Sequence, residues 1–190
     1  MASVENITGV ILAGGEGRRV GHRDKGLIAW KGKPLIAHVV ARLAPQVQEL
    51  LISCNRNVPL YETFAARTIT DPRVGYQGPL AGLEAAAPLV RTDFLIVVCC
   101  DTPDLPPDLV QRLIAPFSVT HEAKVDVTFA HDGARAQYLC AALRRECLAS
   151  LSEFLDAGHR AVKEWFGSRN AIAVDFSDRE ECFRNFNRMD

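Results

Sequence analysis

The sequence predicts a doubly wound α/β fold: a mostly parallel sheet flanked by helices, with a small antiparallel strand element late in the chain. A strand near the N-terminus runs into a glycine-rich loop and then into a helix, and one central segment is apolar without interruption. Strands and helices then alternate along most of the chain, which is the pattern of a sheet with helices packed on both faces.

The first half of the chain supplies the parallel part of the predicted sheet. Ile7 to Leu12 is expected as the first strand and Leu50 to Ser53 as the second. Helices are expected to begin at Pro34 and Pro79, because proline is tolerated in the first turn of a helix and the apolar residues that follow recur at helical spacing. Phe94 to Cys100 is apolar on both faces, as a central strand of a covered parallel sheet should be.

The second half of the chain departs from simple alternation. Pro106 and Pro107 open a further helix, and the order of elements then changes. The elements expected there are a strand at Val125 to Ala130, a strand at Tyr138 to Ala142, helices at Cys147 to Leu155 and Val162 to Phe166, and a strand at Ala171 to Phe176. Phe183 to Asn187 alternates apolar and polar residues, which favours an edge strand.

Composition narrows the class of protein. With 190 residues and 48% hydrophobic content, residues 1–190 are expected to form one domain. The 22 Lys and Arg nearly balance the 23 Asp and Glu, so the broad basic field of a non-specific nucleic-acid binder is missing. Apolar runs are too short for a signal peptide or a membrane span, so we expect neither nucleic acid nor membrane as a partner.

The six cysteines predict free thiols. They show neither Cys-x-x-Cys spacing nor paired histidines, which argues against a zinc site. Free thiols fit the reducing cytoplasm, where we expect the protein to act. Cys99 and Cys100 are expected to serve packing.

The glycine-rich loop after the first strand predicts a nucleotide-phosphate site. Gly14 and Gly15 let backbone N–H groups approach an anion, while Arg18, Arg19 and Lys25 supply positive charge that a structural turn does not need. The loop is not a Walker loop, because Gly follows Lys25 where Ser or Thr is required. It also lacks the third glycine of the dinucleotide fingerprint, so NAD binding is not expected.

Polar residues that follow the other strands should meet this loop. In doubly wound sheets ligands bind beyond the carboxyl ends of the strands, so Gly14, Gly15, Asn55, Asp71 and Asp101 are expected to converge. A carboxylate at the end of the central strand can hold Mg²⁺ against ligand phosphates, which makes Asp101 the candidate metal ligand. The alternative for each aspartate is a turn or a helix cap.

Two further loops leave alternatives open. Gly75 to Gly82 leads into a helix. Its glycines and proline fit equally well a turn that only begins the helix and a second loop that binds a ligand. His131 to Arg135 is better explained as a polar turn than as a catalytic His-Asp pair, because no Ser or Cys nucleophile has an elbow motif.

Over nearly its whole length the chain resembles the bacterial molybdenum cofactor guanylyltransferases, which have a Rossmann-like nucleotidyltransferase fold. The matching residues are Leu12-Ala13-Gly14-Gly15, Arg19, Asp24-Lys25-Gly26-Leu27, Gly32-Lys33-Pro34-Leu35, His38-Val39, Asn55-Arg56, Gly78-Pro79-Leu80-Ala81-Gly82, Cys100-Asp101-Thr102-Pro103, His131-Asp132-Gly133, Asn185 and Asn187.

The resemblance implies a role for each matching site residue. The implied GTP-binding residues are Leu12, Ala13, Gly14, Gly15, Lys25, Asn55, Asp71 and Asp101. Asp71 would contact the guanosine part, and Asp101 would also bind Mg²⁺, the expected cofactor. Arg19, Lys25 and Asp101 would be the catalytic residues. Residues 1–105 would form roughly the GTP side and residues 106–190 the pterin side, where Asn185 and Asn187 would lie.

The implied reaction is attack by the terminal phosphate of molybdenum-molybdopterin on the α-phosphorus of GTP, with release of pyrophosphate. The two departures from the family pattern fall on the pterin side: Gln137-Tyr138 stands near a position where relatives often have proline, and Asn187 is not followed by the usual threonine and proline. A molybdoenzyme or a delivery chaperone would receive the product, though no surface for either is evident.

Three other functions remain as alternatives. A molybdopterin cytidylyltransferase would use CTP on the same pterin, and a sugar-phosphate nucleotidyltransferase would share the glycine-rich basic loop. A non-catalytic molybdopterin carrier would bind the pterin alone, but Lys25 and Asp101 together favour an enzyme that holds a triphosphate.

Overall fold

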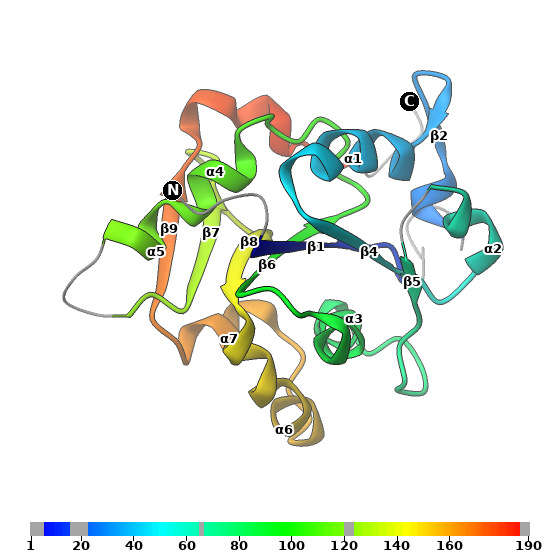
Figure 1. Ribbon diagram of the computed structural model, residues 1–190. Coiled ribbons are helices and arrows are strands. Elements are labelled where there is room, and N and C mark those ends of the chain that lie inside the picture. The colour runs from blue at the N-terminus through cyan, green and yellow to red at the C-terminus, as the bar shows by residue number, and fades with distance from the viewer. Residues whose placement is uncertain (1–5, 16–22, 65–66, 120–123, 187–190) are drawn as a thin grey trace.

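The computed structural model describes residues 6–15, 23–64, 67–119 and 124–186. Within these residues, seven strands form one sheet in the order β5-β4-β1-β6-β8-β7-β9, and helices cover both of its faces (Figure 1). The strands of this sheet are β1 (Ile7–Leu12), β4 (Glu49–Ser53), β5 (Arg67–Ile69), β6 (Phe94–Cys99), β7 (Val127–His131), β8 (Ala136–Arg144) and β9 (Ala171–Asp175).

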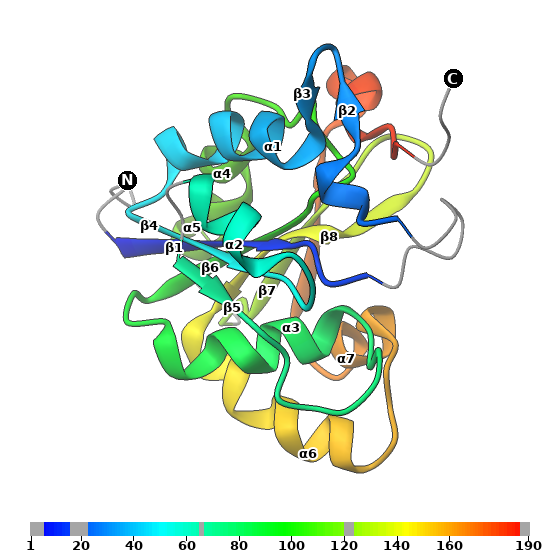
Figure 2. The same ribbon diagram turned by 90° about the vertical axis from the view of Figure 1, so that its right-hand side faces the viewer.

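The helices lie in two layers around the sheet. They are α1 (Leu35–Leu43), α2 (Val58–Tyr61), α3 (Pro79–Ala86), α4 (Leu109–Ile114), α5 (Pro116–Val119), α6 (Leu151–Asp156) and α7 (Val162–Gly167). Helices α1 and α4 lie on one face, and α3, α6 and α7 on the other, as Figure 2 shows with the sheet close to edge-on. Each layer buries its own apolar cluster against the sheet.

Strand directions confirm the predicted fold class. β1 pairs in parallel with β4 and β6, and β4 pairs in parallel with β5. β8 is antiparallel to both β6 and β7, while β9 is parallel to β7. The late antiparallel element is therefore one strand, β8, inserted between two parallel groups.

The central strands are buried on both faces, which accounts for the unbroken apolar sequence of β6. All six residues of β1 are buried: Ile11 packs in the cluster with α1 and α4, and Val10 in the cluster with α3 and α6. Burial of one such aliphatic side chain stabilises the fold by roughly 1.5–3 kcal/mol. Because successive side chains of a strand point to opposite faces of the sheet, β1 contributes to both apolar clusters.

Several boundaries differ from the sequence prediction. The strand expected to end at Ala130 continues to His131, and β8 is longer than expected. The helix expected to begin at Cys147 is a 3₁₀ helix, Arg145–Ser150, followed by α6, and α4 begins at Leu109, beyond the two prolines.

The predicted edge strand at Phe183 to Asn187 is wrong for the part that the structure describes. A 3₁₀ helix, Ser177–Phe183, occupies its start, and Phe183 is buried edge-to-face against Phe176 with ring centroids 5.3 Å apart. The apolar residues of this segment therefore anchor it by packing on other aromatic rings, Phe183 on Phe176 and Phe186 on Trp30, rather than by pairing with the sheet. Asn187 lies outside the described residues.

A small hairpin that the sequence reasoning missed follows the glycine-rich loop. Its strands are β2 (Ala29–Trp30) and β3 (Lys33–Pro34), and Lys31 and Gly32 both have positive φ, at 47° and 78°. Positive φ at both central residues is the requirement of a tight type I′ turn. None of the helices in the described parts of the chain has the length and apolar character that a membrane span needs.

Candidate active site

A cavity of about 260 Å³ opens beyond the carboxyl ends of β1, β4, β5 and β6, next to the first turn of α3. Of the predicted GTP-binding residues, seven line this cavity: Leu12, Ala13, Gly14, Gly15, Lys25, Asp71 and Asp101. The eighth, Asn55, contacts Asp71. We call this cavity the donor pocket.

Glycines let the backbone segments around the donor pocket approach one another closely. A Cβ atom on Gly82 would lie 2.6 Å from Ser53 Oγ and 2.9 Å from Leu12 Cδ2, so only glycine lets the start of α3 pack on the ends of β1 and β4. Gly78 precedes α3 with φ of 84°, and Pro79 is the first residue of the helix. The N-terminus of α3 therefore faces the cavity, where its N–H groups favour an anion. The Gly75 to Gly82 loop thus lines a pocket as well as starting a helix.

Asp71 is held rigidly at one wall of the donor pocket. Asn55 Nδ2 donates a hydrogen bond to Asp71 Oδ2 at 2.7 Å, and the Asp71 backbone N–H donates to Asn55 Oδ1 at 2.9 Å. Ser53 Oγ lies 3.5 Å from Asp71 Oδ1. Burial raises the pKa of the Asp71 carboxyl above its ordinary value, although the hydrogen bonds from Asn55 and Ser53 oppose that shift. The carboxylate is thus partly desolvated and orientated to accept donors from a ligand.

Lys25 and Asp101 form an ion pair at the opposite wall. Lys25 Nζ lies 2.8 Å from Asp101 Oδ2, and each side chain is about one fifth exposed, at 21% and 20%. Asp101 follows β6, and its Oδ1 accepts a longer hydrogen bond of 3.4 Å from Thr102 Oγ1. A cation and a carboxylate are therefore both available to a phosphate group and its counterion.

A buried tyrosine fixes the turn that carries Lys25. Asp24 immediately precedes this 3₁₀ turn, and its carboxylate accepts hydrogen bonds from the Tyr61 hydroxyl and, at 3.0 Å, from Asn57 Nδ2. Tyr61 is fully buried, and burial raises its pKa, so the hydroxyl stays protonated and donates. Gly26 fits only without a side chain, because its Cβ would lie 2.4 Å from the Tyr61 oxygen. These supports were not found from the sequence, since no local pattern links Asp24 to residues 57 and 61.

Two predicted site residues lie outside the described residues: Arg19, with its neighbour Arg18, and Asn187. The described ends of the glycine-rich loop are joined by Arg56, whose Nη2 donates to the carbonyl oxygens of Gly15 at 3.2 Å and Arg23 at 3.3 Å. Arg56 therefore fixes where this loop leaves and rejoins the fold.

A second pocket, of about 370 Å³, meets the donor pocket at Cys99, Asp101 and Leu139. Gln137, Lys163 and Asn185 contribute polar side chains to its lining. The Phe186 backbone N–H donates to the carbonyl oxygen of Asp101 at 2.8 Å, which brings Asn185 next to the junction. We call this cavity the acceptor pocket.

The loop after β7 orientates Gln137 in the acceptor pocket. Gln137 Nε2 donates to Asp132 Oδ2 at 2.6 Å, while the backbone N–H groups of Ala134 and Arg135 donate to Asp132 Oδ1 at 2.9 Å and 2.7 Å. Burial of Asp132 acts to raise its pKa, but these hydrogen bonds outweigh it and the pKa is lowered. The His131 to Arg135 segment is thus a polar turn, as expected, and not a catalytic pair.

The cysteines near the junction are free thiols. Cys99, Cys100 and Cys140 are free, and burial raises the pKa of each well above its ordinary value. A thiol with a raised pKa is a poor nucleophile and a poor metal ligand. In the described residues, no group of three or more His, Cys, Asp or Glu side chains is arranged to hold a metal ion.

Comparison with known proteins identifies the family. Residues 9–172 match the model of the MobA-like NTP transferase domain. The chain is 43% identical over 181 residues to a molybdenum cofactor guanylyltransferase of Shewanella piezotolerans, a match that covers 95% of this chain and 87% of the relative. The chain belongs to the molybdenum cofactor guanylyltransferase family. Another guanylyltransferase of this family, from Shewanella sediminis, is 42% identical over 181 residues, and the match covers 95% of this chain and 91% of that relative.

Solved structures share the fold of this guanylyltransferase family member. Molybdopterin-guanine dinucleotide biosynthesis protein A from Archaeoglobus fulgidus superposes with a TM-score of 0.75 at 21% identity, covering 95% of this chain and 92% of its own. A 4-diphosphocytidyl-2C-methyl-D-erythritol synthase from Anaerococcus prevotii superposes with a TM-score of 0.73 at 9% identity, and the match covers 98% of this chain and 92% of the synthase chain. The nucleotidyltransferase fold expected from the sequence is thereby confirmed.

Proposed function

We propose that this protein transfers GMP from GTP to molybdenum-molybdopterin, forming the guanine dinucleotide cofactor and pyrophosphate. Membership of the guanylyltransferase family supports this reaction. The structural observation that carries it is the junction of two pockets at Asp101, because a group transfer needs two substrates whose reacting ends meet.

GTP is assigned to the donor pocket. The guanine edge carries adjacent N–H donors, and the fixed carboxylate of Asp71 is an acceptor for such a pair. The triphosphate would then lie toward Gly14, Gly15 and Lys25, where backbone N–H groups and a cation offset its charge. Asn55 acts on GTP through Asp71, whose orientation it fixes.

The pterin is assigned to the acceptor pocket. Gln137 and Asn185 offer amide groups that can both donate to and accept from a polar heterocycle, and Lys163 supplies a cation beside the anionic substrate. Asn187 is proposed to act on the same side.

Mg²⁺ is proposed as the cofactor, and Asp101 is the residue that would hold it. Magnesium is commonly bound by one or two carboxylates together with substrate phosphates and water, so a single carboxylate at the pocket junction fits this ion. When bound, Mg²⁺ supplies neutralisation of the negative charge that develops on the phosphates.

The chain's own residues then have a positioning and electrostatic task. The terminal phosphate of molybdopterin is ionised at neutral pH, so one of its oxygens can bond to the α-phosphorus while the bond from that phosphorus to the pyrophosphate oxygen breaks. Lys25 and the N–H groups near Gly14 offset the repulsion between the two anions. Arg19 is proposed to assist them. No protein nucleophile or general base is needed.

The assignment of Asp101 is tested by its amide variant. Asp101→Asn should lose most of its pyrophosphate release with GTP and molybdenum-molybdopterin, and chelation of Mg²⁺ should stop the wild type in the same way. Asp104→Asn is the control, because Asp104 is a half-exposed residue nearby whose carboxylate lies 3.9 Å from Lys31 Nζ. A folded Asp101→Asn protein with normal turnover would refute the assignment.

A further inference from the structure

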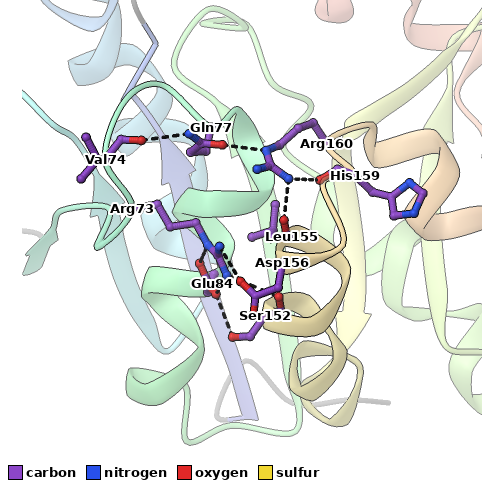
Figure 3. Close-up of polar contacts among 9 residues, drawn as sticks. All are labelled: Arg73, Val74, Gln77, Glu84, Ser152, Leu155, Asp156, His159 and Arg160. Carbon is purple, nitrogen blue, oxygen red and sulfur yellow. Dashed lines mark hydrogen bonds and ion pairs between the residues drawn. The ribbon is translucent and has the colours of Figure 1, made fainter.

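The segment of residues 71–78, which we call the nucleotide loop, forms one wall of the donor pocket. Asp71, Tyr76 and Gly78 of this loop line the pocket, and Gly75 and Gly78 have positive φ, at 78° and 84°. The loop is secured to its surroundings by two arginines, one at each half (Figure 3).

Arg73 secures the first half of the nucleotide loop to two helices. Its Nε and Nη2 donate to the two carboxylate oxygens of Glu84 on α3, at 2.6 Å and 2.7 Å, and its Nη1 donates to Asp156 at the end of α6, at 2.8 Å. Ser152 Oγ of α6 donates to the same Glu84 at 2.7 Å. The hydrogen bonds from Arg73 lower the pKa of Glu84, so this pairing stays ionised. The base of the loop is therefore fixed.

Gln77 connects the second half of the nucleotide loop to Arg160. Its Nε2 donates to the carbonyl oxygen of Val74 at 2.9 Å within the loop, and its Oε1 accepts a hydrogen bond of 2.8 Å from Arg160 Nε. Figure 3 shows Gln77 between Val74 and Arg160, with each end of the amide engaged.

Arg160 belongs to the segment that leads into the acceptor pocket. We call residues 157–161 the connecting loop, since it joins α6 to α7 and turns at Gly158, with φ of 88°. Arg160 Nη1 donates to the carbonyl oxygens of Leu155 at 2.7 Å and His159 at 2.6 Å. The residues directly after it, Ala161 to Lys163, line the acceptor pocket. One guanidinium group thus links the walls of both pockets.

We propose that the hydrogen bond between Gln77 and Arg160 couples the binding of the two substrates. A guanine nucleotide that binds the fixed Asp71 and packs on Tyr76 also orders Gln77, and through Arg160 it orders the backbone that leads to Lys163. The acceptor then meets a wall that is already ordered, so the entropy lost on its binding is smaller. By linkage, the acceptor strengthens nucleotide binding by the same factor. This inference rests on the proposed assignment of the acceptor pocket to the pterin.

The test is equilibrium binding of guanosine 5′-(α,β-methylene)triphosphate. A methylene group joins its α- and β-phosphorus atoms, so this linkage is not cleaved and GMP is not transferred. Its Kd is measured in Mg²⁺ with and without saturating molybdopterin. For the wild type, molybdopterin should lower this Kd about fivefold or more. In Gln77→Ala and in Arg160→Ala the ratio should fall close to one. Gln77→Glu keeps an acceptor for Arg160 but loses the Nε2 donor to the Val74 carbonyl oxygen, so its ratio should lie between those of the wild type and Gln77→Ala.

The matched control is Gln48→Ala, which makes the same change at an exposed glutamine just before β4, at the opposite end of the sheet. It should keep the wild-type ratio. A role for Gln77 and Arg160 in stability alone would lower the melting temperature of their variants without changing the ratio. An unchanged ratio in those variants, or a wild-type ratio of one, would overturn the proposal.

Gln137→Ala separates this proposal from the assignment on which it rests. If the acceptor pocket binds the pterin, Gln137→Ala weakens molybdopterin binding whether or not the pockets are coupled. If it leaves the Kd for molybdopterin unchanged, the pocket assignment fails, and the coupling through Arg160 fails with it.

Discussion

Replacing Lys25 by alanine removes the ammonium group that lies 2.8 Å from Asp101 Oδ2 at the donor pocket. Both side chains are only about one fifth exposed, so the deletion leaves the Asp101 carboxylate largely buried without its cation and should lower the free energy of unfolding by about 1–3 kcal/mol. Loss of one charged donor to a developing phosphate charge typically costs about 2–4 kcal/mol of transition-state stabilisation. At about 1.4 kcal/mol per tenfold, kcat/KM for GTP should fall roughly 30- to 900-fold.

The assay follows pyrophosphate release against GTP concentration, alongside thermal unfolding of the same preparations. Lys124→Ala is the control, since Lys124 pairs with Glu146 through side chains that are 59% and 58% exposed, away from both pockets. It should leave kcat/KM unchanged. If Lys25→Ala also keeps its kcat/KM within twofold, or if its loss of rate is matched by loss of folded protein, Lys25 has no part in the transfer.

The remaining predictions concern packing and protonation. Gly82→Ala should lower the free energy of unfolding by about 1–3 kcal/mol through overpacking, whereas Gly167→Ala, with open space at its Cβ, should be neutral or slightly stabilising; equal melting temperatures would contradict this. Tyr61→Phe should cost about 1–3 kcal/mol and reduce kcat/KM, because Asp24 loses a buried donor; an unchanged melt and rate would exclude that role. Burial raises the pKa of Asp71, so its ionised form is disfavoured in the native state: Asp71→Asn should be more stable than the wild type at pH 7 and bind GTP more weakly. In denaturation curves this gain should shrink as the pH falls through the raised pKa toward the ordinary value of 3.8, and a gain that grows instead would reverse the sign of the argument.

The parallel part of the sheet could be predicted because the burial of a central strand shows in the sequence of that strand itself. β1 and β6 are buried on both faces, and the continuous apolar sequence of β6 shows it directly. The hairpin of β2 and β3 was not predicted, because strands of two residues are too short to show a periodic pattern in the sequence. The segment that begins at Phe183, where a 3₁₀ helix ends, was mistaken for a strand because an alternating pattern does not reveal that Phe183 packs on Phe176.

The candidate site divides in the same way. Asp101 could be placed because it follows the predicted strand Phe94 to Cys100, whose carboxyl end lies at the ligand-binding edge of the sheet, whereas Asp71 follows β5, a strand that was not predicted. The hydrogen bond from Tyr61 to Asp24 and that from Arg160 to Gln77 join residues 37 and 83 positions apart. Such contacts depend on how loops fold over the sheet, and the spacing of residues in a single sequence does not predict that arrangement.

The most direct test of the proposed reaction is pyrophosphate release by the purified protein with Mg²⁺ and molybdenum-molybdopterin, comparing GTP, CTP and a control without pterin. The account predicts release with GTP, dependent on the pterin and accompanied by formation of the guanine dinucleotide. Release with CTP instead would assign a cytidylyltransferase activity. Tight pterin binding without release from either nucleotide would contradict the account and identify a carrier.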